Sequence, residues 1–150
     1  MRHRQKVWVE KASAASIKRS ALKLAQHILA IKDNDVLPKH IGEILHIIVW
    51  KVTEANGKHG TRYISEGVYN GQGPVRHEHV LTRKHLVERM LREPDNVPQV
   101  LDTAIGCLVT KEEHHLLTKA SRFEGWDRYR EAGIRVFDRR EQKWIELGKS

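Results

Sequence analysis

Cysteine is nearly absent from this 150-residue sequence, which contains only Cys107. A single thiol cannot form an intramolecular disulfide, and a zinc site built from cysteine ligands is excluded as well. Cys107 lies in an apolar run that includes Ile105, Leu108 and Val109. This context is typical of a small buried side chain rather than of a nucleophile.

Long hydrophobic runs are also missing. The most apolar stretch, residues 41–52, is interrupted by Glu43, His46 and Lys51. It is shorter and more polar than the run of about 20 apolar residues that a membrane-spanning helix needs. The basic N-terminal residues are not followed by the apolar core of a secretory signal. We therefore expect a protein that has no membrane partner and is located in the cytoplasm.

Basic residues are in excess, with 27 Lys and Arg against 19 Asp and Glu, a net charge of +8 and ten His in addition. A basic protein of this size usually binds an anion, most often a nucleic acid. Residues 1–31 alone contain seven Lys or Arg and a single acid, Glu10. Within them Lys18, Arg19 and Lys23 are candidate phosphate contacts, while an ordinary solvated helix face would explain the same composition equally well.

The first 56 residues predict a pair of helices. The first helix extends from the N-cap Ser13 to about Ile31, and the second covers residues 37–55, between Pro38 and the stop signal Asn56-Gly57. We expect the second helix to be central in the core. Apolar residues recur at helical spacing and predict the buried faces, which are Ile17, Ala21, Leu24, Ile28 and Ile31 in the first helix and Ile41, Ile44, Leu45, Ile48, Val49 and Val52 in the second.

Residues 57–119 predict alternating strands and helices. A short strand at 58–65 is followed by a loop that is rich in glycine. Thr110-Lys111-Glu112-Glu113 matches the Thr-x-x-Glu capping box and starts a helix that carries His114 and His115. The elements expected between the loop and this helix are a strand at 75–81, helices at 83–92 and 98–104, and a strand at 105–110.

The C-terminal residues 120–150 predict a helix at 126–132, stopped by Gly133, and two strands at 134–137 and 144–147. The length fits one domain with a hydrophobic core. The predicted fold class is therefore α+β and mainly helical, in a single domain over residues 1–150. Its sections are a helical part (1–56), a strand–strand–helix motif (76–119) and a C-terminal extension (120–150).

Three titratable side chains, His77, Glu78 and His79, stand together on one predicted strand, and His114 opens the second turn of a later helix. A metal-dependent phosphodiesterase needs these residue types. One imidazole deprotonates water, a carboxylate and a second imidazole hold a divalent cation, and basic side chains hold the phosphate backbone. His40 and His46, on the second predicted helix, we interpret as structural or surface residues.

The order of these elements resembles that of the ββα-metal nucleases, also called His-Me finger or HNH nucleases. Glu78-His79-Val80 is similar to the Asp-His-Ile element on their first strand. Residues 109–114 are similar to their transition from second strand to helix. The resemblance covers about residues 76–119 and implies an endonuclease that hydrolyses DNA with a bound divalent ion, which is Mg²⁺, Mn²⁺, Ni²⁺ or Zn²⁺.

Carried over position by position, the resemblance implies His79 as general base, with Glu78 and His114 as metal ligands. His115 is the alternative ligand, and His77 assists the base or replaces a ligand. The predicted nucleic-acid contacts are Arg76, Arg83, Lys84 and Lys111. The family often has an asparagine between its two strands that orients the catalytic histidine. Here Ile105-Gly106-Cys107 occupies that region, and the cysteine pairs of many members are absent.

Other interpretations remain open. On an extended strand His77 and His79 share a face, so that they and His114 would form a three-imidazole metal site with Glu78 opposite. The histidines are also numerous enough to be neighbours by chance. A second functional hypothesis is a non-catalytic nucleic-acid-binding protein of a phage or mobile element. A third is a homodimer formed through residues 41–52.

Overall fold

The computed structural model describes residues 5–148. Its composition, 49% helix and 12% strand, confirms an α+β fold that is mainly helical. In this range the α-helices are α1 (Ala14–Leu29), α2 (Pro38–Thr53), α3 (Glu66–Tyr69), α4 (Arg83–Arg92), α5 (Val97–Asp102), α6 (Lys111–Lys119) and α7 (Trp126–Glu131). The strands are β1 (Tyr63–Ser65), β2 (Val75–His79), β3 (Gly106–Thr110), β4 (Val136–Asp138) and β5 (Lys143–Trp144).

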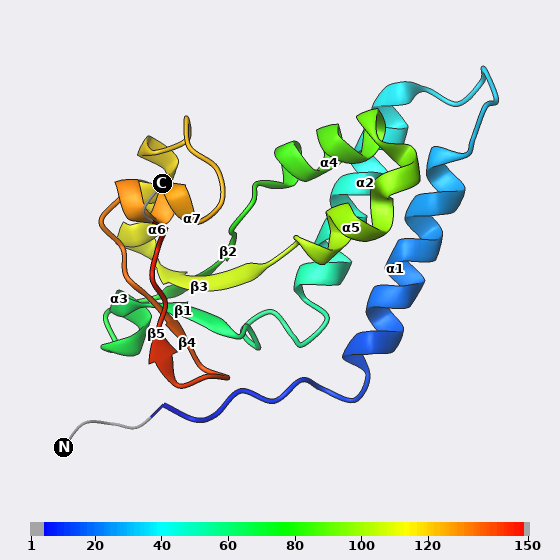
Figure 1. Ribbon diagram of the computed structural model, residues 1–150. Helices are drawn as coiled ribbons and strands as arrows, with labels where there is room; N and C mark the ends of the chain where they lie inside the picture. The colour runs from blue at the N-terminus through cyan, green and yellow to red at the C-terminus, as the bar shows by residue number, and fades with distance from the viewer. Residues whose placement is uncertain (1–4, 149–150) are drawn as a thin grey trace.

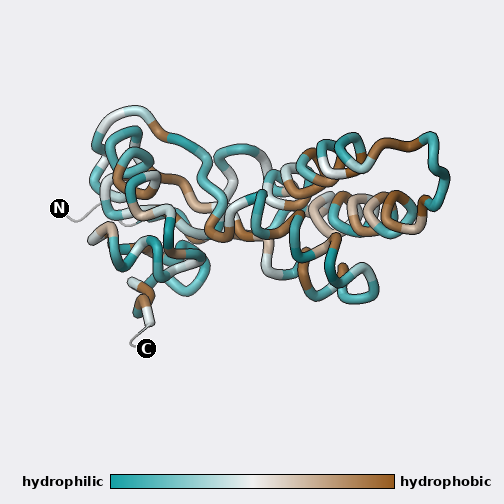
Figure 2. Tube along the Cα trace, turned by 90° about the horizontal axis from the view of Figure 1, so that it is seen from above, coloured by the Kyte–Doolittle hydropathy of each residue, from teal (hydrophilic) through white to brown (hydrophobic). Residues whose placement is uncertain are grey.

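The helices α1, α2, α4 and α5 gather at one end of the molecule, and the sheet lies at the other end with α3, α6 and α7 (Figure 1). We call these groups the helical part and the sheet part. Two of the connections between the helical part and the sheet part are short. They lead from β2 into α4 and from α5 into β3. Hydrophobic segments run through the elements of both parts (Figure 2). Within residues 5–148 no helix has the length and apolar content needed to cross a membrane.

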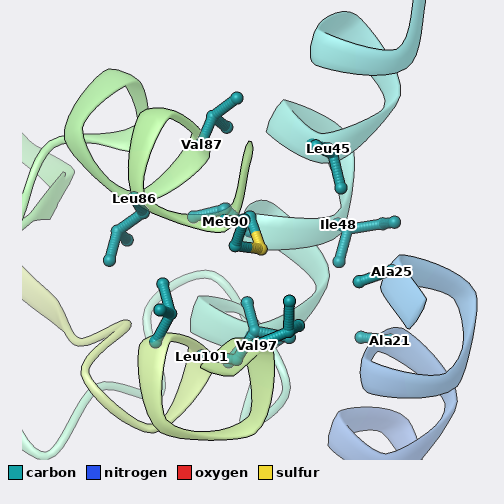
Figure 3. Packing of buried hydrophobic residues seen from close by; sticks show 12 residues of the cluster. Ala21, Ala25, Leu45, Ile48, Leu86, Val87, Met90, Val97 and Leu101 are labelled. Atoms are coloured by element: carbon teal, nitrogen blue, oxygen red, sulfur yellow. The ribbon is translucent and has the colours of Figure 1, made fainter. Parts of the chain in front are cut away.

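The core of the helical part is built around α2, as the sequence predicts (Figure 3). The buried residues of α2 are Leu45, Ile48, Val49 and Val52, and they pack against α1, α4 and α5. Ile44, predicted to be buried, is 44% exposed. Because most of the apolar face of residues 41–52 is used inside the protein, Ile44 and Ile47 are the large apolar residues of this segment left exposed for a partner.

The predicted buried stripe of α1 is wrong for three of its five residues. Ile17, Leu24 and Ile31 are 37%, 53% and 40% exposed. The face that α1 buries is centred on the small residues Ala14, Ala21 and Ala25 instead. Alanine leaves room for the helix backbone to approach its neighbours. The covered face is therefore the one that allows the closest helix packing, not the one with the largest apolar side chains. α1 also ends at Leu29, two residues before the predicted end at Ile31.

The sheet has the strand order β2-β3-β1-β4-β5, with β2 at one edge. β3 pairs in parallel with β1 and antiparallel with β2. Cys107 and Val109 on β3 face one side, where they meet Leu117 of α6 and Tyr129 of α7, whereas Leu108 faces the other side. Cys107 is fully buried, which confirms the prediction of a small core side chain.

Local signals predicted several elements of this part well. Thr110 caps α6 with a complete capping box, in which the Glu113 side chain accepts from the Thr110 backbone N–H at 2.9 Å. The predicted loop after residue 65, in contrast, contains α3, because the Ser65 hydroxyl accepts from the Val68 N–H and caps a short helix. The first predicted strand is shorter than expected and covers only Tyr63–Ser65, and the two C-terminal strands are shifted to Val136–Asp138 and Lys143–Trp144.

Neighbouring residues on α4 provide a test of the helical core. Met90 is fully buried, and Leu91 is 48% exposed. We expect Met90→Ala to lower the free energy of unfolding by about 2–5 kcal/mol, since it leaves a cavity. Leu91→Ala is the matched control and should change it by less than about 0.5 kcal/mol. Urea unfolding followed by circular dichroism measures both, and equal losses would contradict this packing.

Candidate functional site

The pairing of β2 with β3 sorts the candidate catalytic residues onto two faces of the sheet. Glu78 lies opposite Cys107, and His77 lies opposite Leu108. Directly paired residues of antiparallel strands point to the same side. Glu78 therefore shares a face with α6 and α7, whereas His77 and His79 face the end of α2.

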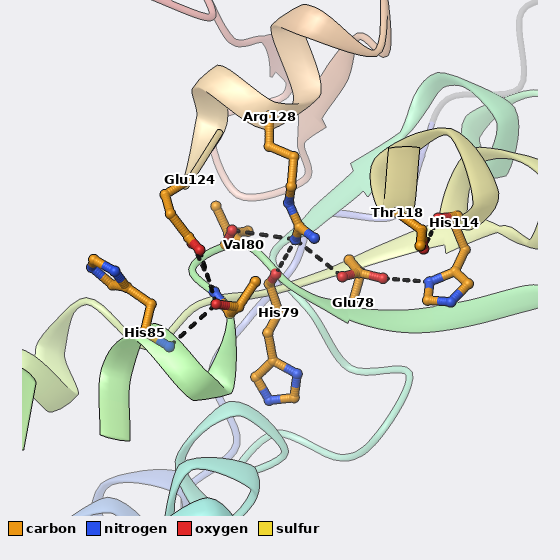
Figure 4. Close-up of polar contacts among 9 residues, drawn as sticks. Glu78, His79, Val80, His85, His114, Thr118, Glu124 and Arg128 are labelled. Carbon is orange, nitrogen blue, oxygen red and sulfur yellow. Dashed lines mark hydrogen bonds and ion pairs between the residues drawn. The ribbon is translucent and has the colours of Figure 1, made fainter. Parts of the chain in front are cut away.

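Glu78 is held by two partners on its face (Figure 4). The Nδ1 of His114, on α6, lies 2.6 Å from its Oε2, and the Nη2 of Arg128, on α7, donates to its Oε1 at 3.0 Å. Arg128 is 4% exposed and also donates to the backbone carbonyls of His79 at 2.6 Å and Val80 at 3.4 Å. A carboxylate fixed at both oxygens thus orients an imidazole that remains partly exposed.

His79 lies on the opposite face and is 6% exposed. Its Nε2 is 2.9 Å from the hydroxyl oxygen of Thr53, the last residue of α2, and its ring meets the Trp50 ring edge-on at 4.4 Å between centroids. Burial, with further contributions from His77, Arg83 and Arg128, lowers the pKa of His79 to about 3. The imidazole is therefore neutral at physiological pH, and it is a weaker base than an exposed histidine.

His77 serves a packing role beside His79, with ring centroids 5.3 Å apart. Its Nδ1 lies 2.7 Å from the Lys58 carbonyl oxygen, and its Nε2 is buried without a hydrogen-bond partner within the described residues. Burial is the main reason that its pKa is lowered. The ring lies against the backbone of Gly106, where an added Cβ would come within 2.6 Å of its Cε1. Glycine is therefore required at this position of β3.

A hollow of about 360 Å³ at the edge of β2 is lined by side chains from both faces of this strand. Arg83 and Lys84, from the first turn of α4, line it, and within residues 5–148 neither has a carboxylate partner within 4.0 Å. The Arg83 guanidinium is held over the Trp50 ring at 5.0 Å. The full lining is His46, Trp50, His77, Glu78, His79, Thr82, Arg83, Lys84 and His114.

The structure thus brings six predicted site residues to one hollow, namely His77, Glu78, His79, Arg83, Lys84 and His114. The other predicted site residues do not line it. His115 is exposed on α6, Lys18 forms an ion pair with Glu10 at 3.3 Å, and the rest are exposed at other positions, namely Arg19, Lys23, Arg76 and Lys111. The cations Arg2 and Arg4 of the N-terminal segment lie outside the described residues.

The three-imidazole metal site does not form. His77 and His79 do share a face, as strand alternation predicts, but His114 contacts Glu78 on the opposite face. Among residues 5–148 no group of three or more His, Cys, Asp or Glu side chains is placed to hold a metal ion together. The metal-ligating chemistry that the site offers is the pair Glu78 and His114.

Five residues in or around the site were missed by the sequence-based prediction, namely His46, Trp50, Thr53, Thr82 and Arg128. His46, Trp50 and Thr53 are spaced i, i+4 and i+7 on α2 and therefore share one face, which was a usable signal. Burial, and secondarily Arg83, lowers the pKa of His46. Arg128 had no such signal, because nothing in the local sequence distinguishes a buried arginine on α7 from an exposed one.

No family model matches this chain, and neither a curated protein nor a solved structure matches it. The function is therefore inferred from the geometry of the site and from the local resemblance of residues 76–119 to the ββα-metal nucleases.

Removal of Arg128 should destabilise the protein strongly. Arg128→Ala leaves Glu78 and two strand-end carbonyls without their donor, and we expect a loss of about 3–5 kcal/mol in the free energy of unfolding. Arg130→Ala, which removes a more exposed arginine from the same helix, should cost less than about 1 kcal/mol. Denaturant unfolding compares the two, and a similar loss for both variants would show that the buried ion pair is unimportant.

The low pKa of His79 predicts a pH-dependent stability. Between pH 6.5 and about 3 the unfolded chain binds a proton that folded His79 does not. The free energy of unfolding should therefore fall as the pH is lowered through this window, by up to about 1.4 kcal/mol per pH unit for this group, and be constant above it. Urea titrations with chelator from pH 7.5 to 4.5 measure the slope. His79→Gln should reduce it to the part that His46 and His77 contribute through their own lowered pKa values, whereas His115→Gln, at an exposed position, should not.

Proposed function

We propose that this protein is a divalent-metal-dependent endonuclease that hydrolyses DNA phosphodiester bonds. The observation that carries the proposal is the convergence of Glu78, His114 and neutral His79 on one hollow. Arg83 and Lys84, which have no carboxylate partner among residues 5–148, also line it. The antiparallel pair β2–β3, followed directly by α6, supports it, since this is the order of elements expected from the resemblance to ββα-metal nucleases.

The donor set fits a divalent cation. A carboxylate and an imidazole are ligands that Mg²⁺, Mn²⁺, Ni²⁺ and Zn²⁺ accept. In the free protein Glu78 and His114 hydrogen-bond to each other at 2.6 Å, and a bound ion would replace this contact by bridging them. Two protein ligands leave the remaining coordination positions to water and phosphate oxygens. When bound, such an ion would neutralise the phosphate and stabilise the leaving oxygen.

The residues of the chain have separate tasks in this mechanism. Arg83 and Lys84 bind the phosphate, and Arg128 fixes the Glu78 carboxylate in front of His114. His79 accepts the proton of the attacking water. A phosphate bound at Arg83 offsets one of the positive charges that lower the pKa of His79. Substrate binding therefore makes this imidazole a stronger base than it is in the free protein.

Electrostatics support a polynucleotide substrate, since the chain carries a net charge of +8. The resemblance favours DNA over RNA and accords with the expected cytoplasmic location. A homodimer formed through residues 41–52 would have to use the exposed Ile44 and Ile47 rather than the whole face of this segment.

Plasmid nicking tests the proposal. Wild-type protein should nick supercoiled DNA in the presence of at least one of Mg²⁺, Mn²⁺, Ni²⁺ or Zn²⁺. His79→Ala should slow nicking by about 10²–10⁴-fold, the contribution of a general base. Glu78→Gln and His114→Ala should also require more metal. His115→Ala, which removes the neighbouring exposed imidazole, should retain activity. Wild type that nicks with none of the four ions, or that nicks no faster than His79→Ala, would falsify the assignment.

The second candidate function is non-catalytic nucleic-acid binding. It is favoured by the cations near β2 and α6 that have no carboxylate partner within the described residues, namely Arg76, Arg83, Lys84 and Lys111. In that case binding should weaken as salt rises, because counterions are released, and it should persist in chelator and in His79→Ala.

A further inference from the structure

Thr53 lies where the helical part meets the site. It is the last residue of α2, and its hydroxyl oxygen is 2.9 Å from the Nε2 of His79 on β2. Within residues 5–148 this is the hydrogen bond that the His79 ring makes. Figure 4 shows the His79 ring pointing away from Glu78 and toward the other side of the strand. The ring orientation therefore depends on a residue from outside the sheet.

The hydroxyl proton of Thr53 has its own acceptor. The Thr53 Oγ1 donates to the backbone carbonyl of Trp50, one turn earlier in α2, at 3.4 Å. A hydroxyl has one proton to give, and its lone pairs then accept from other donors. With its proton directed to Trp50, Thr53 acts as an acceptor toward His79. In that arrangement the Nε2 of His79 carries the ring proton and donates to the Thr53 oxygen.

A neutral imidazole carries one N–H and one lone pair. With the proton on Nε2, the lone pair of His79 is on Nδ1. Within the described residues Nδ1 has no hydrogen-bond partner, and it is not one of the unpaired side-chain atoms that are fully buried. Since His79 lines the hollow that also contains Arg83 and His114, Nδ1 is the nitrogen that can meet a water molecule there.

We infer that Thr53 is a positioning residue that holds His79 in the Nε2–H tautomer and presents the unprotonated Nδ1 to the hollow. The tautomer assignment stands on the hydrogen bonds alone, and the catalytic consequence rests on the proposed nuclease function. This role explains how the chain orients the histidine without the expected asparagine, in whose region Ile105-Gly106-Cys107 leads into β3. The orienting group comes from a helix that precedes both strands.

Two substitutions separate the hydroxyl from the shape of the side chain. Thr53→Val removes the hydroxyl and keeps the branched shape, while Thr53→Ser keeps the hydroxyl. The ring nitrogens of His79 are observed by long-range ¹H–¹⁵N correlation spectra of the full-length protein at neutral pH with chelator, and the signal is assigned by its loss in His79→Gln. We expect protonated Nε2 and unprotonated Nδ1 in wild type and Thr53→Ser, and a shift toward the other tautomer in Thr53→Val. Unchanged ¹⁵N shifts in Thr53→Val would overturn the inference.

Nicking kinetics supply the second measurement. Thr53→Val should lower kcat by about tenfold, the size expected from the loss of one hydrogen bond, with KM for DNA unchanged, and Thr53→Ser should restore it. A raised KM with normal kcat would contradict a role in positioning the base. If Thr53→Val does not fold by circular dichroism, Thr53→Ala takes its place in both measurements. If wild type does not nick DNA at all, the proposed function fails, and the spectra still decide the tautomer.

Discussion

The buried guanidinium of Arg128 is the contact on which the geometry of the site depends. It reaches from α7 to the end of β2, where it binds the Glu78 carboxylate and the carbonyl oxygens of His79 and Val80. Backbone carbonyls at a strand end need donors once the ladder stops, and here one side chain supplies them. The same group fixes the direction of the carboxylate. Arg128 therefore binds the backbone where β2 ends before α4 and also positions the Glu78 carboxylate.

Two different electrostatic environments result on the two sides of a single strand. Glu78 lies among polar partners, where Arg128 donates to its carboxylate and the His114 imidazole contacts it. His79 lies one residue later among Trp50, His77 and the Thr53 hydroxyl, where burial keeps its ring neutral. Adjacent residues on a strand point to opposite faces, so the pair Glu78-His79 places a carboxylate and a neutral imidazole on different sides of β2.

Local sequence signals predicted what local interactions determine. The helix at residues 83–92, the capping box at Thr110 and the strand of the histidines follow from caps and periodicity within a few positions. The prediction failed where distant packing decides. The buried face of α1 follows its alanines rather than Ile17 and Leu24, because neighbouring helices select the face that approaches most closely.

In the candidate site, too, local sequence signals were predictive and contacts between distant residues were not. His77, Glu78, His79 and His114 were recognisable from residue type and order, and the structure brings them to one hollow. Thr53 and Arg128 were not, since they are 26 and 49 residues from His79 and reach it only through the topology of the sheet. Residue types therefore indicated which titratable groups gather at the hollow, whereas the partners that orient them required the fold.

The hollow draws its residues from both parts of the molecule, and this has a consequence for how the protein loses its structure. Glu78, His114 and Arg128 are joined within the sheet part, whereas the partner of His79 belongs to the helical part. Proteins open locally in cooperative units that differ in stability. An opening confined to α1 and α2 would release the His79 ring and leave the acid–imidazole pair assembled. The two halves of the site can thus have different lifetimes in the same folded molecule.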